Sequence, residues 1–238
     1  MNISASYYSD IGGRNKNEDA VTILESGSTV LGIVADGLGG HQGGEIASKS
    51  ALRTINARIA HCAVSRTALL EAIQAANSVI LADPSHRTMK TTVAALWLDD
   101  RNALGATVGD TRIYQFRAGR ILYQSIDHSA AQAAVYAGDI TADEIRGSRD
   151  RHKLTRALGA QEEVRADIVS LETAPGDAFL LCSDGFWELL QEEEMLSCLA
   201  ASGSAGEWLK KMRGQVSARS DVSSDNHSAV AIIIKQGD

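Results

Sequence analysis

Thr91–Gln124 reads TTVAALWLDDRNALGATVGDTRIYQFRAGRILYQ, and this stretch decides the fold class. Apolar runs rich in β-branched residues follow one another here, and no helical pattern separates them. The runs are Thr91–Leu98, Ala103–Val108, Thr111–Phe116 and Ile121–Gln124. A doubly wound parallel sheet needs a helix between successive strands, so this order predicts antiparallel pairing instead.

The rest of the chain keeps strands and helices in separate groups. Further strands are expected near Ile3–Tyr8, Ala20–Leu24, Val30–Ala35, Val164–Val169, Ala178–Cys182 and Ser228–Lys235. Helical patterns come in two pairs, at about Gly44–Ala60 with Arg66–Ala82 and at about Glu192–Ala200 with Gly206–Ala218. This grouping predicts an α+β fold in which helices cover antiparallel sheets. Ser129–Thr155 is polar and strand-free, so we expect a surface excursion there, a common place for recognition.

The composition is typical of an ordinary globular protein. Of the 238 residues, 44% are apolar and 22% are charged, which argues against disorder and favours one domain spanning residues 1–238. The net charge of −7 disfavours a nucleic-acid partner, because phosphate backbones select Lys and Arg. No apolar stretch has the length of a signal peptide or a membrane span. We therefore expect a cytoplasmic protein without a membrane partner, and nothing points to anything beyond a monomer.

Short acidic motifs stand mostly where apolar runs end. They are Asn17-Glu18-Asp19, Asp36-Gly37-Leu38-Gly39-Gly40, Val108-Gly109-Asp110, Ser183-Asp184-Gly185 and Asp225-Asn226. No basic residue within the motifs neutralises them, so carboxylates that converge at one sheet edge imply bound cations. Oxygen-only ligands favour Mg²⁺ or Mn²⁺ over zinc, which usually recruits His or Cys. The sequence therefore predicts a metal-dependent enzyme.

Each motif taken alone has a simpler interpretation. Asp36-Gly37 and Asp184-Gly185 both follow a strand-like run, and a tight turn explains either copy in isolation. Asp225-Asn226 is equally consistent with a turn, and Arg14 with an exposed surface residue. The glycine after each Asp is also consistent with a binding site, because it lets a ligand approach the backbone closely.

The joint order of the motifs is far more specific than any one of them. It runs Arg14, Glu18-Asp19, Asp36-Gly37, Thr91-Thr92, Gly109-Asp110-Thr111-Arg112, Asp127-His128-Ser129, Leu154–Gly159, Ser183-Asp184-Gly185 and Asp225-Asn226. Over nearly the whole chain this order resembles the PPM (type 2C) family of metal-dependent Ser/Thr protein phosphatases, particularly its bacterial members. The resemblance implies a four-layer α-β-β-α sandwich: two antiparallel sheets flanked by helix pairs, with a metal site at one end.

The resemblance also assigns ligands for two Mg²⁺ or Mn²⁺ ions. Asp36 would bridge the ions, Asp184 and Asp225 would bind one of them, and the Gly37 carbonyl the other. Glu18 and Asp19 would hold metal-bound waters or accept neighbouring hydrogen bonds, and Asp110 would join Asp184 at a third, weaker ion.

The implied reaction is hydrolysis of phosphomonoesters on phosphoserine and phosphothreonine proteins. A water bridging the two ions would attack in line, without a phosphoenzyme intermediate. Arg14 would bind the non-reacting phosphoryl oxygens and stabilise the charge that develops on them. Bacterial relatives often oppose Ser/Thr kinases, so such a kinase or its targets are the expected partners in signalling.

One position departs from the eukaryotic pattern. Leu38 stands where a histidine, proposed as the general acid, often follows the Asp-Gly pair. The proton donor is then a metal-bound water or another group such as His41 or His128, although a structural role is the simpler expectation for both histidines.

The excursion at about residues 129–155 corresponds to the flap of the family. Its residues Arg149, Arg151, His152 and Lys153 either meet an acidic phosphopeptide or are plain surface charge. Thr91-Thr92 is expected on a core strand beneath the site, and we assign it no chemistry.

The residues disfavour three competing functions. A catalytically weak, phosphoprotein-binding regulatory module of the same fold is disfavoured because Asp36, Asp184 and Asp225 are all present. A phosphodiesterase or nuclease is disfavoured by the acidic balance. A cysteine nucleophile at Cys62 is disfavoured because only Ala63–Ser65 separates it from Arg66, too short a loop to ring a phosphate. Cys182 and Cys198 show no metal-type spacing either, so idle thiols are expected.

Overall fold

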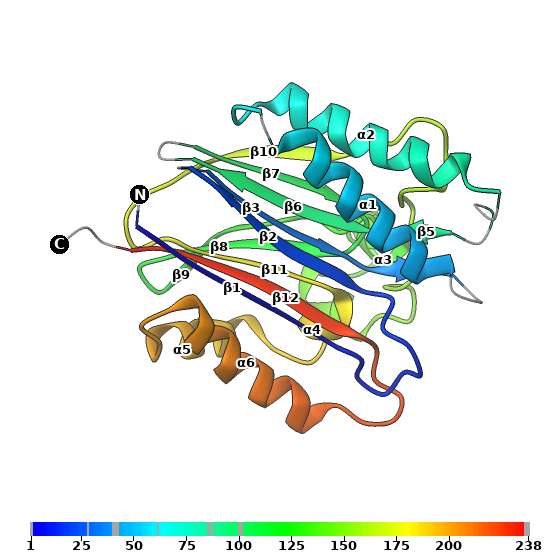
Figure 1. Cartoon of the computed structure of the whole chain (residues 1–238). Coiled ribbons are helices and arrows are strands. Elements are labelled where there is room, and N and C mark those ends of the chain that lie inside the picture. The colour runs from blue at the N-terminus through cyan, green and yellow to red at the C-terminus, as the bar shows by residue number, and fades with distance from the viewer. Residues whose placement is uncertain are drawn as a thin grey trace.

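The computed structural model describes residues 2–27, 29–39, 43–60, 62–84, 87, 89–99 and 102–235. Within these residues, two five-stranded antiparallel sheets pack face to face (Figure 1). The first sheet has the order β1 (Ile3–Asp10), β12 (His227–Ile234), β11 (Ala178–Cys182), β8 (Arg112–Arg117) and β9 (Arg120–Gln124). The second has the order β10 (Asp167–Glu172), β7 (Asn102–Val108), β6 (Val93–Leu98), β3 (Thr29–Ala35) and β2 (Ala20–Ser26). A short separate ladder joins β4 (Gly37–Leu38) to β5 (Lys90–Thr91).

Helices cover the outer face of each sheet. The pair α1 (Gly43–Ile59) and α2 (Arg66–Ala82) packs on the second sheet, and the pair α5 (Glu192–Ala200) and α6 (Ala205–Arg219) on the first (Figure 1). A single turn, α4 (Asp184–Trp187), follows β11 directly. The excursion predicted from the sequence holds α3 (Ala130–Ala137) and the 3-10 helix η2 (Ala142–Gly147); we call residues 129–155 the flap.

Three apolar layers hold the sandwich together. Along β3, Leu31 and Ile33 face the layer under α1 and α2, whereas Val30 and Val34 face the layer between the sheets. The third layer lies under α5 and α6 and includes Trp208. Burial of both strand faces explains why β3 reads as a continuous apolar run instead of an alternating one.

The predicted α-β-β-α architecture is confirmed, and two strands differ from expectation in detail. The run from Thr91 to Leu98 is interrupted at Thr92, because the Thr92 amide donates to the carbonyl of Asp36 and not to a sheet neighbour. The strand expected over Val164–Val169 begins only at Asp167, as β10. Val164 instead packs against the layer under α2, so its apolar character reports helix packing.

The connections bring the acidic motifs to one end of the sandwich. β3 and β11 both end there, β12 begins there, and the turn from β7 to β8 crosses between the sheets (right-hand side of Figure 1). Among the described residues, no helix combines the length and apolar character needed to cross a bilayer.

Candidate active site

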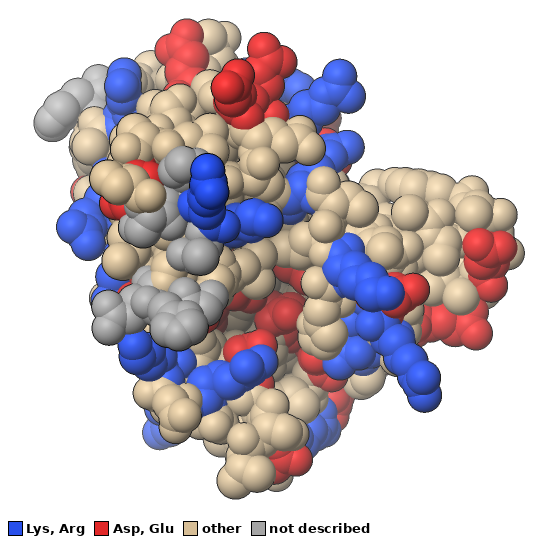
Figure 2. Space-filling model, turned by 90° about the vertical axis from the view of Figure 1, so that its right-hand side faces the viewer, with Lys and Arg blue, Asp and Glu red and all other residues tan. Residues whose placement is uncertain are grey.

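A cleft of about 500 Å³ opens at this end of the sandwich. Seven residues singled out from the sequence contribute to its lining: Arg14, Glu18, Asp36, Gly37, Asp110, Asp184 and Asp225. Asp19, the remaining predicted site residue, lies buried beneath it. Figure 2 shows this face of the molecule, with acidic side chains inside a hollow and Lys and Arg side chains around its rim.

The backbone of Asp36 is held by the two threonines to which the sequence assigned no chemistry. Its carbonyl accepts hydrogen bonds from the Thr92 amide (2.9 Å) and the Thr91 hydroxyl (2.7 Å). Its amide donates to Thr92 Oγ1 (3.2 Å). The two threonines therefore fix the point where β3 ends. Nothing in the sequence distinguishes them from ordinary strand residues.

Glycine is required after Asp36 for a steric reason. A Cβ on Gly37 would lie 2.3 Å from the Gly44 carbonyl oxygen and 2.5 Å from the Glu18 carbonyl oxygen. The chain can thus pass between the start of α1 and the loop before β2 only without a side chain. Ser48 of α1 donates its hydroxyl proton to the same Glu18 carbonyl at 2.5 Å, which fastens that loop to the helix.

Asn226 organises the loop that carries Arg14. Its side-chain amide donates to the carbonyls of Ile11 (2.8 Å) and Lys16 (2.9 Å), and its Oδ1 accepts from the Glu18 amide (2.8 Å). Asn226 belongs to the Asp225-Asn226 motif, but no role was predicted for it. These partners lie more than two hundred positions away in the chain, so no local pattern could have identified them.

Asp184 and Asp19 approach each other through Ser183. The Ser183 hydroxyl donates to Asp19 Oδ2 (2.9 Å) and accepts from the Ser228 amide (3.0 Å). Just beyond Asp184, a Cβ on Gly185 would lie 2.2 Å from the Asn226 carbonyl oxygen. The second Asp-Gly pair is therefore also a close contact between backbones.

The cleft is electrostatically unfavourable in the absence of cations. Burial raises the pKa of Asp19 to about 7. Burial, followed by repulsion from Asp184, raises the pKa of Asp36 and of Asp110 well above the usual range. Burial and the nearby Asp225 also raise the pKa of Glu18. Carboxylates that repel one another this strongly form a site for positive charge.

Two buried oxygens in this cluster lack a hydrogen-bond donor. They are Oδ1 of Asp19 and Oδ1 of Asp184. A buried acceptor without a donor is costly and rare in folded proteins, and a cation would satisfy it. The all-oxygen donor set therefore fits Mg²⁺ or Mn²⁺.

One trio of potential metal ligands is already close together in the structure. Among the described residues, the one trio whose potential ligand atoms all lie within 4.8 Å of each other is His152, Asp184 and Glu188. Glu188 in that trio is already paired with Arg151 at 2.6 Å. The oxygens of Asp36, Asp184 and Asp225 do not all lie within 4.8 Å of one another, so an ion bound by all three would draw them closer together.

The histidines named as candidate proton donors lie in different places. His128 is buried, with Nδ1 on the Gly109 amide and Nε2 3.1 Å from Asp167, and it does not line the cleft. His41 lies outside the described residues. His152 lines the cleft, and its Nδ1 lies 3.4 Å from Asp184 Oδ2.

The other three flap residues considered do not line the cleft, although Arg151 lines an adjoining pocket with Arg14 and Asp225. Arg151 and Lys153 pair with the neighbouring acids Glu188 and Asp150 at 2.6 and 2.7 Å, and Arg149 is exposed. Of the four flap residues that were considered for phosphopeptide contact, His152 is the one in the cleft lining.

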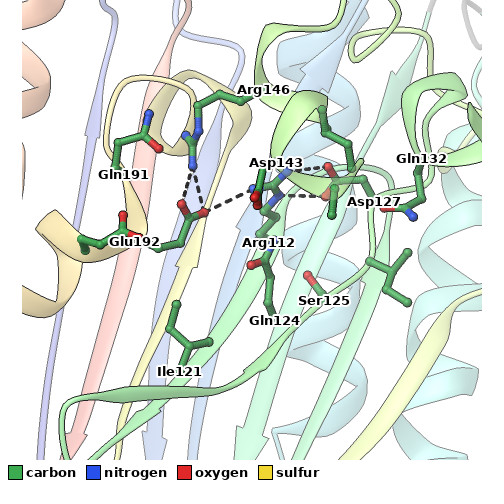
Figure 3. A pocket seen from close by; sticks show the side chains of 14 residues that line it. Arg112, Ile121, Gln124, Ser125, Asp127, Gln132, Asp143, Arg146, Gln191 and Glu192 are labelled. Atoms are coloured by element: carbon green, nitrogen blue, oxygen red, sulfur yellow. Dashed lines mark hydrogen bonds and ion pairs between the residues drawn. The ribbon is translucent and has the colours of Figure 1, made fainter. Parts of the chain in front are cut away.

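A second, larger cavity of about 580 Å³ lies between the flap, β8, β9 and the start of α5 (Figure 3). Its buried charges are already paired. Arg112 binds Asp127 through two hydrogen bonds of 2.9 and 2.7 Å, and Arg146 binds both oxygens of Glu192. Because the unsatisfied oxygens lie in the other cleft, that cleft is the candidate active site.

The cysteines show no sign of a nucleophile. Cys62 is exposed just beyond α1, and its thiol donates to the Arg58 carbonyl at 3.2 Å. Cys182 and Cys198 are buried, and burial raises the pKa of both thiols.

Comparisons with known proteins show which family the fold and the sequence match. A model of the protein phosphatase 2C family matches residues 8–218. A putative protein phosphatase 2C-type from Streptococcus pyogenes is 30% identical over 213 residues, 85% of this chain and 87% of that protein. The solved structure of the PPM Ser-Thr phosphatase MsPP from Mycobacterium smegmatis, in complex with cacodylate, is 32% identical with a TM-score of 0.82, covering 97% of this chain and 98% of that one. The catalytic domain of the serine threonine protein phosphatase PstP, in complex with 2 manganese ions, is 28% identical with a TM-score of 0.84, covering 98% and 99%.

Proposed function

The chain belongs to the protein phosphatase 2C family and is a Ser/Thr protein phosphatase acting on phosphoproteins, and from this premise we propose that the acidic cleft is its catalytic site. The observation that carries the proposal is the pair of buried carboxylate oxygens, on Asp19 and Asp184, that have no hydrogen-bond donor. A solved relative holds 2 manganese ions, which supports two divalent ions here as well.

The ligands that we propose follow from the lining of the cleft. Asp36 would bridge two ions of Mg²⁺ or Mn²⁺, with Asp184 and Asp225 on one side and the Gly37 carbonyl on the other. Asp110 with Asp184 would hold a third, weaker ion, and Glu18 and Asp19 would accept hydrogen bonds from metal-bound water. Bound ions of this kind lower the pKa of a water molecule to make it a nucleophile, and they neutralise phosphoryl oxygens.

Arg14 would bind the substrate phosphate. Its side chain is 55% exposed at the rim, and Nη2 donates to Asp225 Oδ2 at 2.6 Å. A metal ion bound to Asp225 would withdraw negative charge from the carboxylate and so weaken its ion pair with Arg14. The planar guanidinium is then available to two phosphoryl oxygens at once, a geometry that arginine matches closely.

His152 would protonate the leaving oxygen, the role that Leu38 cannot fill. It is the histidine that lines the cleft among the described residues. Its Nδ1 lies 3.4 Å from Asp184 Oδ2, so the ring stands beside the carboxylates that would hold the metal ions and the phosphate ester.

The decisive experiment is phosphate release from a phosphothreonine peptide, measured against Mn²⁺ concentration. We expect the wild type to be activated by Mn²⁺ and silenced by a chelator, and Asp184→Asn to lose at least about 1,000-fold in kcat/KM. Glu71→Gln, which removes an exposed carboxylate of α2, is the control and should match the wild type. Retained activity in Asp184→Asn would contradict the ligand assignment.

The same measurement separates the proposal from a catalytically weak binding module. Such a module would bind the phosphopeptide but release no phosphate at any Mn²⁺ concentration. We further propose that the substrates are products of a Ser/Thr kinase and that the enzyme works in the cytoplasm. Phosphoproteome changes on deletion of the gene and cell fractionation test these two points.

A further inference from the structure

The turn between β7 and β8 places Asp110 in the cleft, and its backbone has a conformation that only glycine adopts readily. Gly109 has φ +104°, and a Cβ there would lie 2.5 Å from the Thr92 side chain. Asp110 itself is 4% exposed and is repelled by Asp184 and Asp127. A buried carboxylate that its neighbours repel needs support from outside the turn to stay where a cation would find it.

His128, just before the flap, supplies the first support. The Gly109 amide donates to His128 Nδ1 at 2.9 Å, and the His128 amide donates to the Gly109 carbonyl at 2.9 Å. The two residues thus exchange a reciprocal pair of hydrogen bonds across nineteen positions of the chain.

These contacts also determine which ring nitrogen of His128 carries the proton. A backbone amide can only donate, so Nδ1 must be unprotonated and the neutral ring holds its proton on Nε2. That nitrogen lies 3.1 Å from Asp167 Oδ2 and also 3.1 Å from Arg156 Nη1. Because a guanidinium can only donate, the Nε2 proton goes to Asp167 Oδ2, while Arg156 donates to Asp167 Oδ1 at 2.7 Å. Burial lowers the pKa of His128, in agreement with a neutral ring. Both ring nitrogens are therefore occupied, and the imidazole has none left for substrate.

Trp187 of α4 supplies the second support. Its indole N–H donates to the Asp110 carbonyl at 3.0 Å. The guanidinium of Arg112 stacks on the indole at 3.6 Å from the ring centroid, and the same guanidinium binds Asp127, the neighbour of His128 (Figure 3 shows the Arg112–Asp127 pair). One buried arginine thereby connects the two supports.

The flap begins at the same place. The His128 carbonyl accepts from the Thr155 amide at 2.8 Å, and the Ala130 amide donates to the Lys153 carbonyl at 2.8 Å. The two ends of the flap are therefore joined at His128, and His152 leaves this junction to enter the cleft.

We propose that His128 is a positioning residue for cation binding: through the Gly109 backbone it sets the place of Asp110, with Trp187 fixing the carbonyl on the other side of Asp110. The inference rests on the proposed role of Asp110 as a ligand. It assigns a function to the Asp127-His128-Ser129 motif, which the proposed chemistry does not use. His128 touches neither substrate nor metal in this role.

The test compares two replacements of the same ring. In His128→Asn, Oδ1 takes the place of Nδ1 and can still accept from Gly109; in His128→Gln, the polar atoms reach only the Nε2 position. Mn²⁺ binding to metal-stripped protein is measured by calorimetry, with Asp110→Asn as the reference and melting in chelator as the control for folding. We expect His128→Gln to bind about tenfold more weakly at the site that Asp110→Asn loses, and His128→Asn to stay within about threefold of the wild type.

Each outcome decides a separate point. Equal Mn²⁺ affinity of the Gln and Asn variants would show that His128 only stabilises the fold, and the inference would be wrong. If Asp110→Asn itself binds Mn²⁺ like the wild type, the proposed ligand role fails instead. Should His128→Gln not fold, Trp187→Phe removes the other hydrogen bond while keeping an aromatic ring over Arg112, and unchanged Mn²⁺ binding in that variant would overturn the inference.

Discussion

Arg14 and Asp225 form an ion pair at the mouth of the cleft that is weak as a structural contact. Their side chains are 55% and 39% exposed, and exposed pairs contribute about 0–1 kcal/mol at most. Such a pair is easily exchanged for stronger partners, which is what a phosphate-binding residue next to a metal ligand requires. Replacement of Arg14 should therefore leave the stability of the fold unchanged, so a loss of activity in such a variant would report its function.

We expect Arg14→Gln to lower kcat/KM by about tenfold to hundredfold, because a charge-assisted hydrogen bond to the transition state is lost. Melting temperature and Mn²⁺ affinity should stay unchanged. Arg213→Gln is the matched control, since Arg213 also forms an exposed pair with an aspartate, Asp10, at 2.9 Å. Steady-state kinetics on both variants check this, and an equal loss in the two would sink the assignment.

The proton-donor role of His152 is tested by the leaving group. Threonine leaves as a poor alkoxide that needs a proton, whereas p-nitrophenolate leaves without one. We expect His152→Gln to lower kcat about 100-fold on a phosphothreonine peptide and to affect p-nitrophenyl phosphate little. Lys153→Gln, at the next position in the flap, should change neither rate. A uniform loss on both substrates would mean that His152 positions the site without donating a proton.

At the scale of elements, the turn between β7 and β8 joins the two sheets and also carries a candidate ligand. Gly109 in this turn is therefore required for two reasons: the turn has a positive φ, and the backbone lies close to Thr92. Gly119, in the hairpin between β8 and β9, has a positive φ of +73° but no atom within 4 Å of a built Cβ. A side chain at Gly119 would meet only the unfavourable backbone conformation, whereas a side chain at Gly109 would also collide with Thr92.

We expect Gly119→Ala to cost about 1 kcal/mol, the usual penalty of a left-handed backbone at a non-glycine residue. Gly109→Ala should cost several times more, because its Cβ would also displace Thr92, which holds Asp36. Mn²⁺ activation should be shifted to higher concentration in Gly109→Ala alone. Chemical unfolding in chelator measures the loss of stability, and Mn²⁺ titration of activity measures the shift in activation. Equal values for Gly109→Ala and Gly119→Ala in both measurements would contradict the steric argument.

The elements that the sequence predicted well are those with strong local periodicity. The bounds of α2 and α5 agree with the structure, because an apolar stripe at helical spacing is independent of distant residues. β10 was misplaced because Val164 owes its burial to α2, and the break at Thr92 depends on Asp36, fifty-six positions earlier. The convergence of the acidic motifs was predicted from their joint order along the chain and not from local periodicity. The hydrogen bonds of Asn226 and His128 had no local signal at all.

At the scale of the whole molecule, the cleft draws its carboxylates from both sheets. Asp36 follows β3 of one sheet, whereas Asp184 and Asp225 flank β11 and β12 of the other. Repulsion among these groups opposes the packing of the two sheets at this end, and cations between them would relieve it. Metal binding should therefore stabilise the entire sandwich and not only the loops around the cleft.

This coupling predicts how stability depends on pH in metal-stripped protein. Burial raises the pKa of Asp19 from 3.8 to about 7, and the pKa values of Asp36 and Asp110 move in the same direction. Between pH 4 and pH 7 the folded state therefore binds more protons than the unfolded state, so the free energy of unfolding falls as the pH rises through this window. We expect the melting temperature in chelator to be lower at pH 7.5 than at pH 5.5, by about 2–4 °C for each kcal/mol lost.

Added Mn²⁺ should reverse this trend, because the ions bind the ionised carboxylates and compete with protons at lower pH. The rise in melting temperature on adding Mn²⁺ is thus expected to be larger at pH 7.5 than at pH 5.5. Asp19→Asn is the control: it keeps an acceptor for Ser183 but cannot ionise, so its melting temperature in chelator should depend less on pH. If calorimetric melts of metal-stripped wild type and Asp19→Asn show the same pH dependence, the buried carboxylates are not the source of the instability, and the electrostatic case for a cation site loses its main support.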